Sequence, residues 1–167
     1  MKTLVYYSSL TGNTRKVGEA IAKSLNADIK SIDESVNLDD YSKVIFGFYV
    51  DKGFMDKKTQ SFAKDIKNKT LGIYFTLGAE PDGPHAKECM DKTKEYFRDL
   101  GNDIKASFCS QGAIDPKVIA QLRQMAAKMG DKAIHKITPE REARWKEAAK
   151  HPNEEDLKNA VKAFENF

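Results

Sequence analysis

Apolar positions along the first 112 residues form two alternating patterns. Short runs rich in β-branched and aromatic residues are typical of strands, and the continuously apolar ones are typical of strands buried on both faces of a parallel sheet. Between these runs, apolar residues recur every three or four positions, as in amphipathic helices. The predicted strands are residues 3–8, 27–32, 43–48, 70–76 and 103–108. The predicted helices between them are residues 14–25, 56–67 and 85–100.

Polar segments with glycine or proline separate these elements and predict loops at 49–55, 77–84 and 110–112. Strands that alternate with helices favour a parallel sheet with helices on both faces. Right-handed crossovers then restrict the topology to a few doubly wound forms.

Residues 113–167 contain three further helical patterns. The first, 116–129, has apolar residues at helical spacing, and Thr138 followed by Pro139 predicts the start of a helix at 139–150. Asn153 is a good cap for a last helix that reaches Phe167. A five-stranded α/β domain needs one helix after its fifth strand. We therefore interpret 1–167 as a single domain with an added helical segment, 113–152, in which Trp145 is expected to anchor its helix to the body.

The bulk composition fits one soluble domain. The chain has 167 residues, of which 40% are hydrophobic and 32% charged, and its mean hydropathy is −0.61. No apolar run approaches the roughly 18 residues of a membrane span. The apolar run near the N-terminus is too short for the core of a signal peptide. These features predict a cytoplasmic protein that does not associate with membranes.

Charge and cysteine usage exclude several other classes. The 28 basic and 25 acidic residues are dispersed and give a net charge of +3, so no block of Lys and Arg predicts nucleic-acid binding. Cys89 and Cys109 form neither a disulfide framework nor a metal cluster, and we expect them in the core. His135 and His151 lack partners at metal-ligand spacing, and no carboxylate pair indicates acid–base catalysis. We therefore assign no metal site and no catalytic residue.

Candidate chemistry concentrates in the loop Ser8-Ser9-Leu10-Thr11-Gly12-Asn13-Thr14, which joins the first strand to the first helix. Ligands of doubly wound sheets bind outside the carboxyl ends of the strands, and free N–H groups at a helix start suit an anion. The loop adds hydroxyl and amide donors, and Gly12 permits a tight turn. Neither the triphosphate pattern G-x-x-x-x-G-K-[ST] nor the dinucleotide pattern G-x-G-x-x-G fits. The loop therefore predicts a monophosphate site, the alternative being a polar turn in which Thr11 or Asn13 only caps the helix.

The segment from Val5 to Thr14, followed by Val17, Ala20 and Ile21, resembles the phosphate-loop signature of the flavodoxin superfamily. It departs from the family at Gly18, where Ala is usual, and we expect this exchange of one small residue for another to matter little. The resemblance covers about 1–112 plus the last helix. It implies a flavodoxin-like doubly wound five-stranded parallel sheet of order 2-1-3-4-5, here with extra helices before the C-terminal helix. It also implies FMN as the cofactor, with Ser9, Thr11, Asn13 and Thr14 holding its phosphate.

Two further segments, 47–53 and 76–86, resemble a narrower flavodoxin-like branch through Gly47 to Gly53, Thr76 to Ala79, Pro81-Asp82 and His85-Ala86. This branch is found in anaerobic bacteria, and some of its members are paired with reductases, including bilirubin reductases. The resemblance therefore implies a redox partner protein for this chain.

In flavodoxins the loops after strands three and four sandwich the flavin ring. Here Tyr49 is the expected stacking residue, whereas 77–84 has no aromatic residue, so we expect one ring face to be less covered than usual. The net charge of +3 and the nearby Lys52 predict a less negative reduction potential than in acidic flavodoxins. The residues expected to bind the cofactor are Ser8, Ser9, Leu10, Thr11, Gly12, Asn13, Thr14, Tyr49, Val50, Asp51, Thr76, Leu77 and Gly78.

Three functions are compatible with this pattern. The first is an FMN-binding electron-transfer protein that donates electrons to a partner reductase, which requires no acid–base residue. The second is an FMN-dependent reductase that acts directly on a quinone or a similar small acceptor. The third is an interaction module without flavin. The added helices could form a homodimer surface or a lid.

Overall fold

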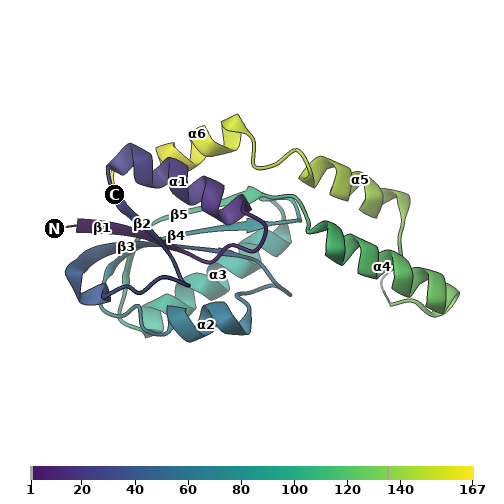
Figure 1. Cartoon of the computed structure of the whole chain (residues 1–167), viewed down its shortest axis with the longest axis horizontal. Coiled ribbons are helices and arrows are strands. Elements are labelled where there is room, and N and C mark those ends of the chain that lie inside the picture. The colour runs from purple at the N-terminus through teal and green to yellow at the C-terminus, as the bar shows by residue number, and fades with distance from the viewer. Residues whose placement is uncertain (1, 135) are drawn as a thin grey trace.

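The computed structural model describes residues 2–134 and 136–167, so His135 lies outside the described residues. Five strands pair in parallel in the order β2-β1-β3-β4-β5, which confirms the predicted doubly wound sheet (Figure 1). The strands are β1 (Lys2–Tyr7), β2 (Asp28–Ser31), β3 (Tyr41–Tyr49), β4 (Thr70–Leu77) and β5 (Asp103–Gln111). The helices are α1 (Asn13–Leu25), α2 (Lys57–Ala63), α3 (Pro84–Asp99), α4 (Pro116–Met129), α5 (Pro139–Ala148) and α6 (Glu154–Ala163). Within the described ranges, no helix is long and apolar enough to cross a bilayer.

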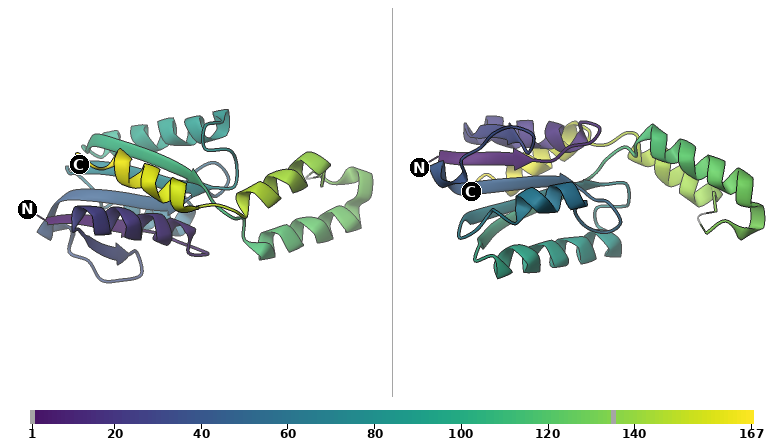
Figure 2. Two further views of the ribbon diagram at one scale, coloured as in Figure 1. Left: turned by 90° about the horizontal axis from the view of Figure 1, so that it is seen from above. Right: turned by 60° about the horizontal axis from the view of Figure 1, so that its bottom comes forward.

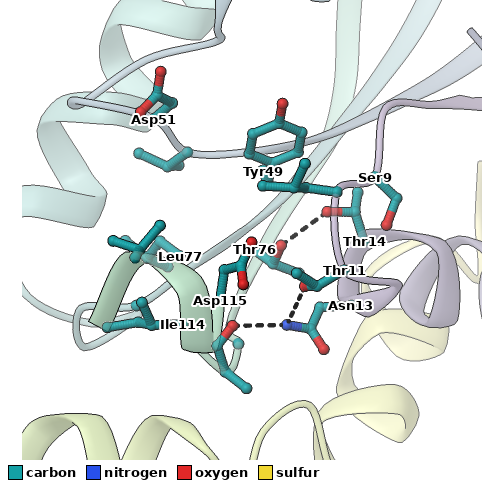
Figure 3. A pocket seen from close by; sticks show the side chains of 16 residues that line it. Ser9, Thr11, Asn13, Thr14, Tyr49, Asp51, Thr76, Leu77, Ile114 and Asp115 are labelled. Atoms are coloured by element: carbon teal, nitrogen blue, oxygen red, sulfur yellow. Dashed lines mark hydrogen bonds between the residues drawn. The ribbon is translucent and has the colours of Figure 1, made fainter. Parts of the chain in front are cut away.

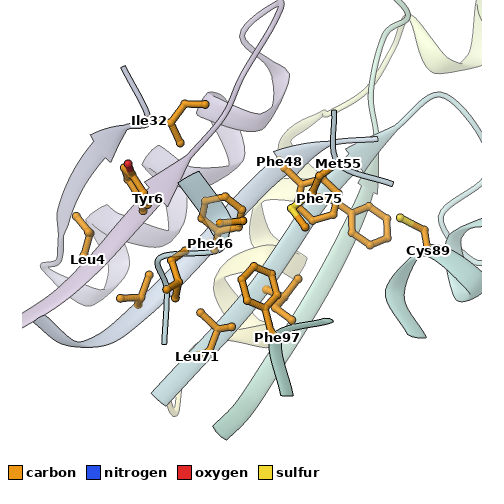
Figure 4. Packing of buried hydrophobic residues seen from close by; sticks show 14 of the residues in the cluster. Leu4, Tyr6, Ile32, Phe46, Phe48, Met55, Leu71, Phe75, Cys89 and Phe97 are labelled. Atoms are coloured by element: carbon orange, nitrogen blue, oxygen red, sulfur yellow. The ribbon is translucent and has the colours of Figure 1, made fainter. Parts of the chain in front are cut away.

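The sheet separates two apolar layers. Helices α1 and α6 cover one face and α2 and α3 cover the other (Figures 1 and 2). Because side chains alternate along a strand, β3 sends Phe46 and Phe48 to the α3 side and Ile45 to the α1 side. All three are fully buried. The rings of Phe46 and Phe97 contact each other edge-on, with their centroids 5.7 Å apart (Figure 4). Burial on both faces explains why the β3 segment is continuously apolar.

Several element boundaries differ from those expected. Ser110 and Gln111 belong to β5 and not to an exit loop, because they pair with the last two residues of β4. Helix α2 ends at Ala63 instead of residue 67. The last helix ends at Ala163 instead of residue 167, and the chain then turns so that the Phe164 and Phe167 rings contact each other at 6.0 Å. The longer strands carry the carboxyl edge of the sheet further than the hydropathy pattern indicated.

The added segment is a helical hairpin, α4 and α5, that extends beyond the carboxyl ends of the strands (Figures 1 and 2). The expectation that Trp145 anchors its helix to the body is wrong. Trp145 is buried but joins neither apolar layer of the sheet, and the Arg123 guanidinium of α4 lies over its ring at 5.4 Å. Trp145 therefore holds α5 against α4. Helix α4 itself has no buried residue.

One long-range contact explains Gly18. The fully buried Tyr74 of β4 extends its hydroxyl toward α1 and donates to the carbonyl oxygen of Thr14 at 3.2 Å. A Cβ atom at Gly18 would overlap this hydroxyl. The expectation that Gly18 and Ala are interchangeable here is therefore wrong, because the hydroxyl of Tyr74 occupies the space that an alanine methyl group would need.

We predict that Gly18→Ala destabilises the chain by about 1–3 kcal/mol, the usual cost of overfilling a packed core. Tyr74→Phe costs about 1 kcal/mol through its lost hydrogen bond. In the Tyr74→Phe background the cost of Gly18→Ala should fall, because the hydroxyl is gone and only the 3.3 Å approaches of the new Cβ to the ring Cζ and to Val5 Cγ1 remain. Urea denaturation measures all four free energies of unfolding.

Gly47→Ala is the matched control, because its Cβ would overlap the ring carbons of Tyr74 as well as the hydroxyl. Tyr74→Phe should therefore not rescue Gly47→Ala. Simple additivity of Gly18→Ala and Tyr74→Phe would contradict the proposed contact.

Candidate cofactor site

A cavity of about 200 Å³ opens at the carboxyl ends of β1, β3, β4 and β5 (Figure 3). This is the edge of a doubly wound sheet where ligands bind. Figure 3 shows the loop after β1 on one side, with Leu77 and Ile114 on the other. The lining residues are Ser9, Leu10, Thr11, Asn13, Thr14, Tyr49, Val50, Asp51, Thr76, Leu77, Gly78, Gly112, Ala113, Ile114, Asp115 and Val118.

The structure brings most of the expected site residues together. Eleven of the thirteen line the cavity, and the exceptions are Ser8 and Gly12. Ser8 is buried beneath the loop, where its hydroxyl accepts a hydrogen bond from Thr59 at 2.8 Å. Gly12 is the N-cap of α1 and has a left-handed backbone, with φ of 98°. Both therefore shape the loop from behind the lining, and ligand binding by all thirteen stays a prediction.

The loop forms a cradle of donors at the start of α1. The Oγ atom of Ser9 accepts hydrogen bonds from the backbone N–H groups of Gly12 at 3.2 Å and Arg15 at 3.3 Å. An anion oxygen accepts from amides in the same way, and the positive end of α1 favours a negative charge. The Ser9 hydroxyl can also turn to donate to such an oxygen. This donor set fits a phosphate monoester.

Side-chain hydrogen bonds fix the cradle to the rest of the fold. The hydroxyls of Thr14 and Thr76 lie 2.9 Å apart, so the loop is tied to the end of β4. Asn13 donates through Nδ2 to the carbonyl of Ala113 at 3.0 Å and to Thr11 Oγ1 at 3.4 Å. The loop is thereby held from below by the sheet and from the side by the segment that follows β5.

Tyr49 lies at the end of β3, half-buried in the cavity wall. Its hydroxyl donates to Asp56 Oδ2 at 2.6 Å, and Asp56 caps α2 by accepting the Thr59 N–H at 2.8 Å. Burial, together with the bond to Asp56, raises the pKa of Tyr49 far above its usual value. Burial alone would raise the pKa of Asp56, but hydrogen bonds from Thr59 and Tyr49 outweigh it and lower that pKa. Tyr49 is therefore a fixed, neutral wall residue, and its stacking on a flavin remains a prediction.

The segment after β5 supplies the lining residues that sequence reasoning missed. Ile114 packs over Gly78, and Asp115 and Val118 continue the wall into the first turn of α4. Their position after the strand next to β4 was the available indication, but they were assigned to the added segment. The loop 77–84 contributes only Leu77 and Gly78 to the cavity. The wall expected from that loop is therefore built largely by aliphatic residues from beyond β5.

Charge near the cavity differs from the net charge of the chain. Asp51 and Asp115 line the cavity, and none of the lining residues within the described ranges is Lys or Arg. Lys52 was expected near the flavin ring, but it is exposed in the tight turn Asp51–Phe54 and does not line the cavity. The cavity wall is therefore locally acidic.

The two cysteines lie on the α3 side of the sheet. Cys89 is buried in the core, as expected, and Cys109 is half-buried. The Cys109 thiol donates to the carbonyl of Pro81 at 3.1 Å, and burial raises its pKa to about 11. Such a thiol stays protonated near neutral pH, and it does not line the cavity.

The base of the helical hairpin is fastened beside the cradle. Ala113, whose carbonyl accepts from Asn13, donates its own N–H to the carbonyl of His151 at 3.0 Å. His151 in turn contacts Asp156 of α6 through Nδ1 at 2.6 Å, and Glu147 of α5 through Nε2 at 3.3 Å. These bonds join the two ends of the hairpin to each other and to the phosphate-loop residue Asn13.

The five-stranded sheet of order 2-1-3-4-5 and the cradle at the end of β1 define a flavodoxin-type domain. The family model described as a flavodoxin domain matches residues 4–165, so the chain belongs to this family. Flavodoxin-family proteins bind a flavin, commonly FMN.

Curated relatives and solved structures agree. The chain is 30% identical, over 96% of its length and 92% of the relative's, to the flavodoxin-like domain-containing protein BilS of Clostridioides difficile. An uncharacterized protein of Methanocaldococcus jannaschii is 31% identical over 67% of this chain and 76% of its own. Among solved structures, oxidised flavodoxin 2 from Bacillus cereus superposes with a TM-score of 0.60 at 15% identity, over the full length of both chains. That likeness shows the fold.

We predict that protonated His151 stabilises the folded chain. The Asp156 carboxylate, with a smaller contribution from Glu147, raises the pKa of His151 although burial opposes the shift. A raised pKa gives stability that is complete below the ordinary value of about 6.5 and is lost as pH rises through the folded-state value. The melting temperature of the wild type should therefore exceed that of His151→Gln most near pH 6 and less at alkaline pH.

His85→Gln is the matched control, since His85 is an exposed histidine at the start of α3. Its melting temperature should follow that of the wild type across the pH range. A wild-type advantage over His151→Gln that grows with pH would contradict the assigned sign.

Proposed function

We propose that this chain binds FMN in the cavity at the carboxyl edge of the sheet and carries electrons to a partner reductase. The observation that carries the proposal is the donor cradle, in which two backbone amides and the Ser9 hydroxyl converge at the start of α1. Family membership supports the same cofactor.

The residues that line the cavity fit the two parts of FMN, its phosphate and its ring. Ser9, Thr11, Asn13 and Thr14 would hold the phosphate through hydroxyl, amide and backbone donors. Tyr49 on one wall and the aliphatic Leu77 and Ile114 on the other would border the ring. Bound FMN supplies one- and two-electron redox chemistry, and the chain supplies its binding, orientation and electrostatics.

The titratable groups of the cavity favour an electron carrier. Within the described residues, the lining holds Asp51, Asp115 and Tyr49 as its titratable side chains. Tyr49 keeps its proton because it donates to Asp56, and Asp115 is engaged as the N-cap of α4, where it accepts from the N–H of Lys117 at 2.9 Å. Electron transfer through a bound flavin requires no further acid–base pair.

Ser9→Ala should weaken FMN binding by about 10- to 100-fold, because it removes one charge-assisted hydrogen bond worth about 1.5–3 kcal/mol. Quenching of FMN fluorescence during titration of the apoprotein measures the dissociation constant. Ser35→Ala is the matched control, since Ser35 is an exposed serine outside the cavity lining.

Equal FMN affinity in wild type and Ser9→Ala would contradict the cradle assignment. A purified chain that is colourless and gains no flavin absorbance on addition of FMN would overturn the cofactor itself. That second outcome would favour an interaction module without flavin.

A second candidate function is direct reduction of a small acceptor such as a quinone by the FMN-loaded chain. The observation in its favour is that the 77–84 loop contributes no aromatic side chain to the cavity, whose wall there is aliphatic. Steady-state NAD(P)H oxidation distinguishes the two functions. Rapid turnover with a quinone would favour the reductase, and its absence would favour the carrier.

The acidic lining generates a prediction about redox potential. Asp51→Asn and Asp115→Asn should each make the potential of bound FMN less negative by tens of millivolts, since one charge in a medium of intermediate dielectric changes the energy by on the order of 1 kcal/mol. Asp131→Asn, an exposed change at the distal turn of the hairpin, should leave it unaltered.

Potentiometric titration of the four proteins tests this prediction. It also tests the expectation, drawn from the net charge, that the wild-type potential is less negative than in acidic flavodoxins. A shift in Asp131→Asn as large as in Asp51→Asn would show that overall charge, and not the cavity wall, sets the potential.

A further inference from the structure

Helix α4 exposes an apolar stripe to solvent. Its side chains Val118, Met125 and Met129 are 40%, 49% and 46% exposed, respectively. Spacings of seven and eleven residues place these three residues on one side of the helix. Val118 also lines the cavity, as does Leu10, which is 62% exposed. Helix α4 extends away from the body (Figure 2), so the stripe begins at the mouth of the candidate cofactor site and continues along the helix toward the distal end of the hairpin.

Basic residues accompany the stripe. Helix α4 contains Lys117, Arg123 and Lys128 and no acidic residue. Helical spacing places Lys117 and Lys128 along one border of the stripe, while Arg123 faces α5, where it pairs with Glu142 at 2.6 Å.

The net positive charge of the chain lies in the hairpin. Residues 113–152 hold nine Lys or Arg and five Asp or Glu, a net charge of +4. The whole chain carries +3, so the remainder carries −1. The hairpin is therefore a cationic arm on a nearly neutral body.

The apolar stripe and the positive charge of the hairpin together indicate which kind of molecule could bind to α4. A second copy of the chain in a two-fold contact would bring one cationic arm against another, and like charges across an interface are unfavourable. A partner with an apolar groove bordered by Asp and Glu would match both the stripe and its basic border. Methionines adapt to such grooves, and a single helix laid in a groove is a common mode of recognition.

We propose that α4 is the docking surface for an acidic redox partner protein, which binds the stripe Val118–Met125–Met129 in an apolar groove with an acidic rim. The proposal rests on the proposed electron-transfer function. The 14 residues of α4 span about 21 Å. That is enough for the small interface, below about 1,200 Å², that transient redox complexes use. A partner bound to the stripe would lie beside the mouth of the cavity, because Val118 belongs to both the stripe and the cavity lining.

The test measures electron transfer from the photoreduced, FMN-loaded chain to two forms of one acceptor. Native cytochrome c is basic, and cytochrome c with succinylated lysines is acidic. At low ionic strength the acidic form should be reduced at least about five-fold faster, and this advantage should fall as salt is added. Lys117→Glu with Lys128→Glu should abolish the preference, and Met125→Gln with Met129→Gln should lower the rate at high salt.

Lys64→Glu with Lys67→Glu is the matched control, because it changes the net charge equally at exposed positions after α2, away from the hairpin. It should retain most of the preference. Loss of preference in this control, or equal rates for the two cytochromes with the wild type, would overturn the docking surface.

Reduction of a small neutral quinone by the same photoreduced samples separates the two proposals. Normal quinone reduction without an acidic preference overturns the docking surface alone. Failure to load FMN overturns the proposed function and the docking surface together. A dimer in light scattering that Met125→Gln with Met129→Gln dissociates would show that a second copy is the occupant, and would overturn the acidic partner.

Discussion

The loop between β1 and α1 depends on buried hydroxyl groups that leave it a single arrangement. Ser8 is bonded to Thr59, Thr14 to Thr76, and the carbonyl of Thr14 to the hydroxyl of Tyr74. Each of these polar groups is buried, so each would cost free energy if the loop shifted and left it unpaired. The constraint comes from β4 and α2, which lie outside the loop itself. The shape of the cradle is therefore set by parts of the fold that are distant from it in the sequence.

The same loop also positions the hairpin, because Asn13 bonds to Ala113 and Ala113 bonds to His151. The cavity and the hairpin thus share one hydrogen-bonded junction, and the acidic cavity wall is opposite in charge to the hairpin as a whole. The cavity wall holds Asp51 and Asp115, whereas the excess of Lys and Arg lies in residues 113–152. Charge on the wall acts at short range on whatever occupies the cavity, and charge on the arm acts at long range on what approaches. Asp51 belongs only to the wall and the lysines of α4 only to the arm, so substitutions at these positions would separate the two effects.

The features that depend on local residue pattern could be predicted from the sequence. The positions of residues that depend on contacts with distant parts of the chain could not. The strands, the helices and the loop 8–14 follow from hydropathy and local residue pattern, and the strand order was implied by the resemblance of that loop to the flavodoxin signature. Ile114 and Val118 were missed as wall residues because their place depends on how far β5 pairs with β4. The close contact between Gly18 and Tyr74 involves residues that are 56 positions apart in the sequence, and no local spacing pattern predicts it. Lys52 was misplaced for the opposite reason, since a short turn directs it away from the cavity.

The apolar stripe on α4 is only partly explained by folding. Helix α6 packs on α1 and β5, where the last helix of a five-stranded domain is needed, so the hairpin is inserted without disturbing the core. Within the hairpin, Trp145 and Arg123 join the two helices, and Met125 and Met129 lie outside that contact, half exposed. Met125 is 49% exposed and Met129 46% exposed, and a polar residue at either position would expose less apolar surface to water. Burial within the chain therefore accounts for only part of each methionine side chain, and the proposed interaction with a partner would account for the exposed part.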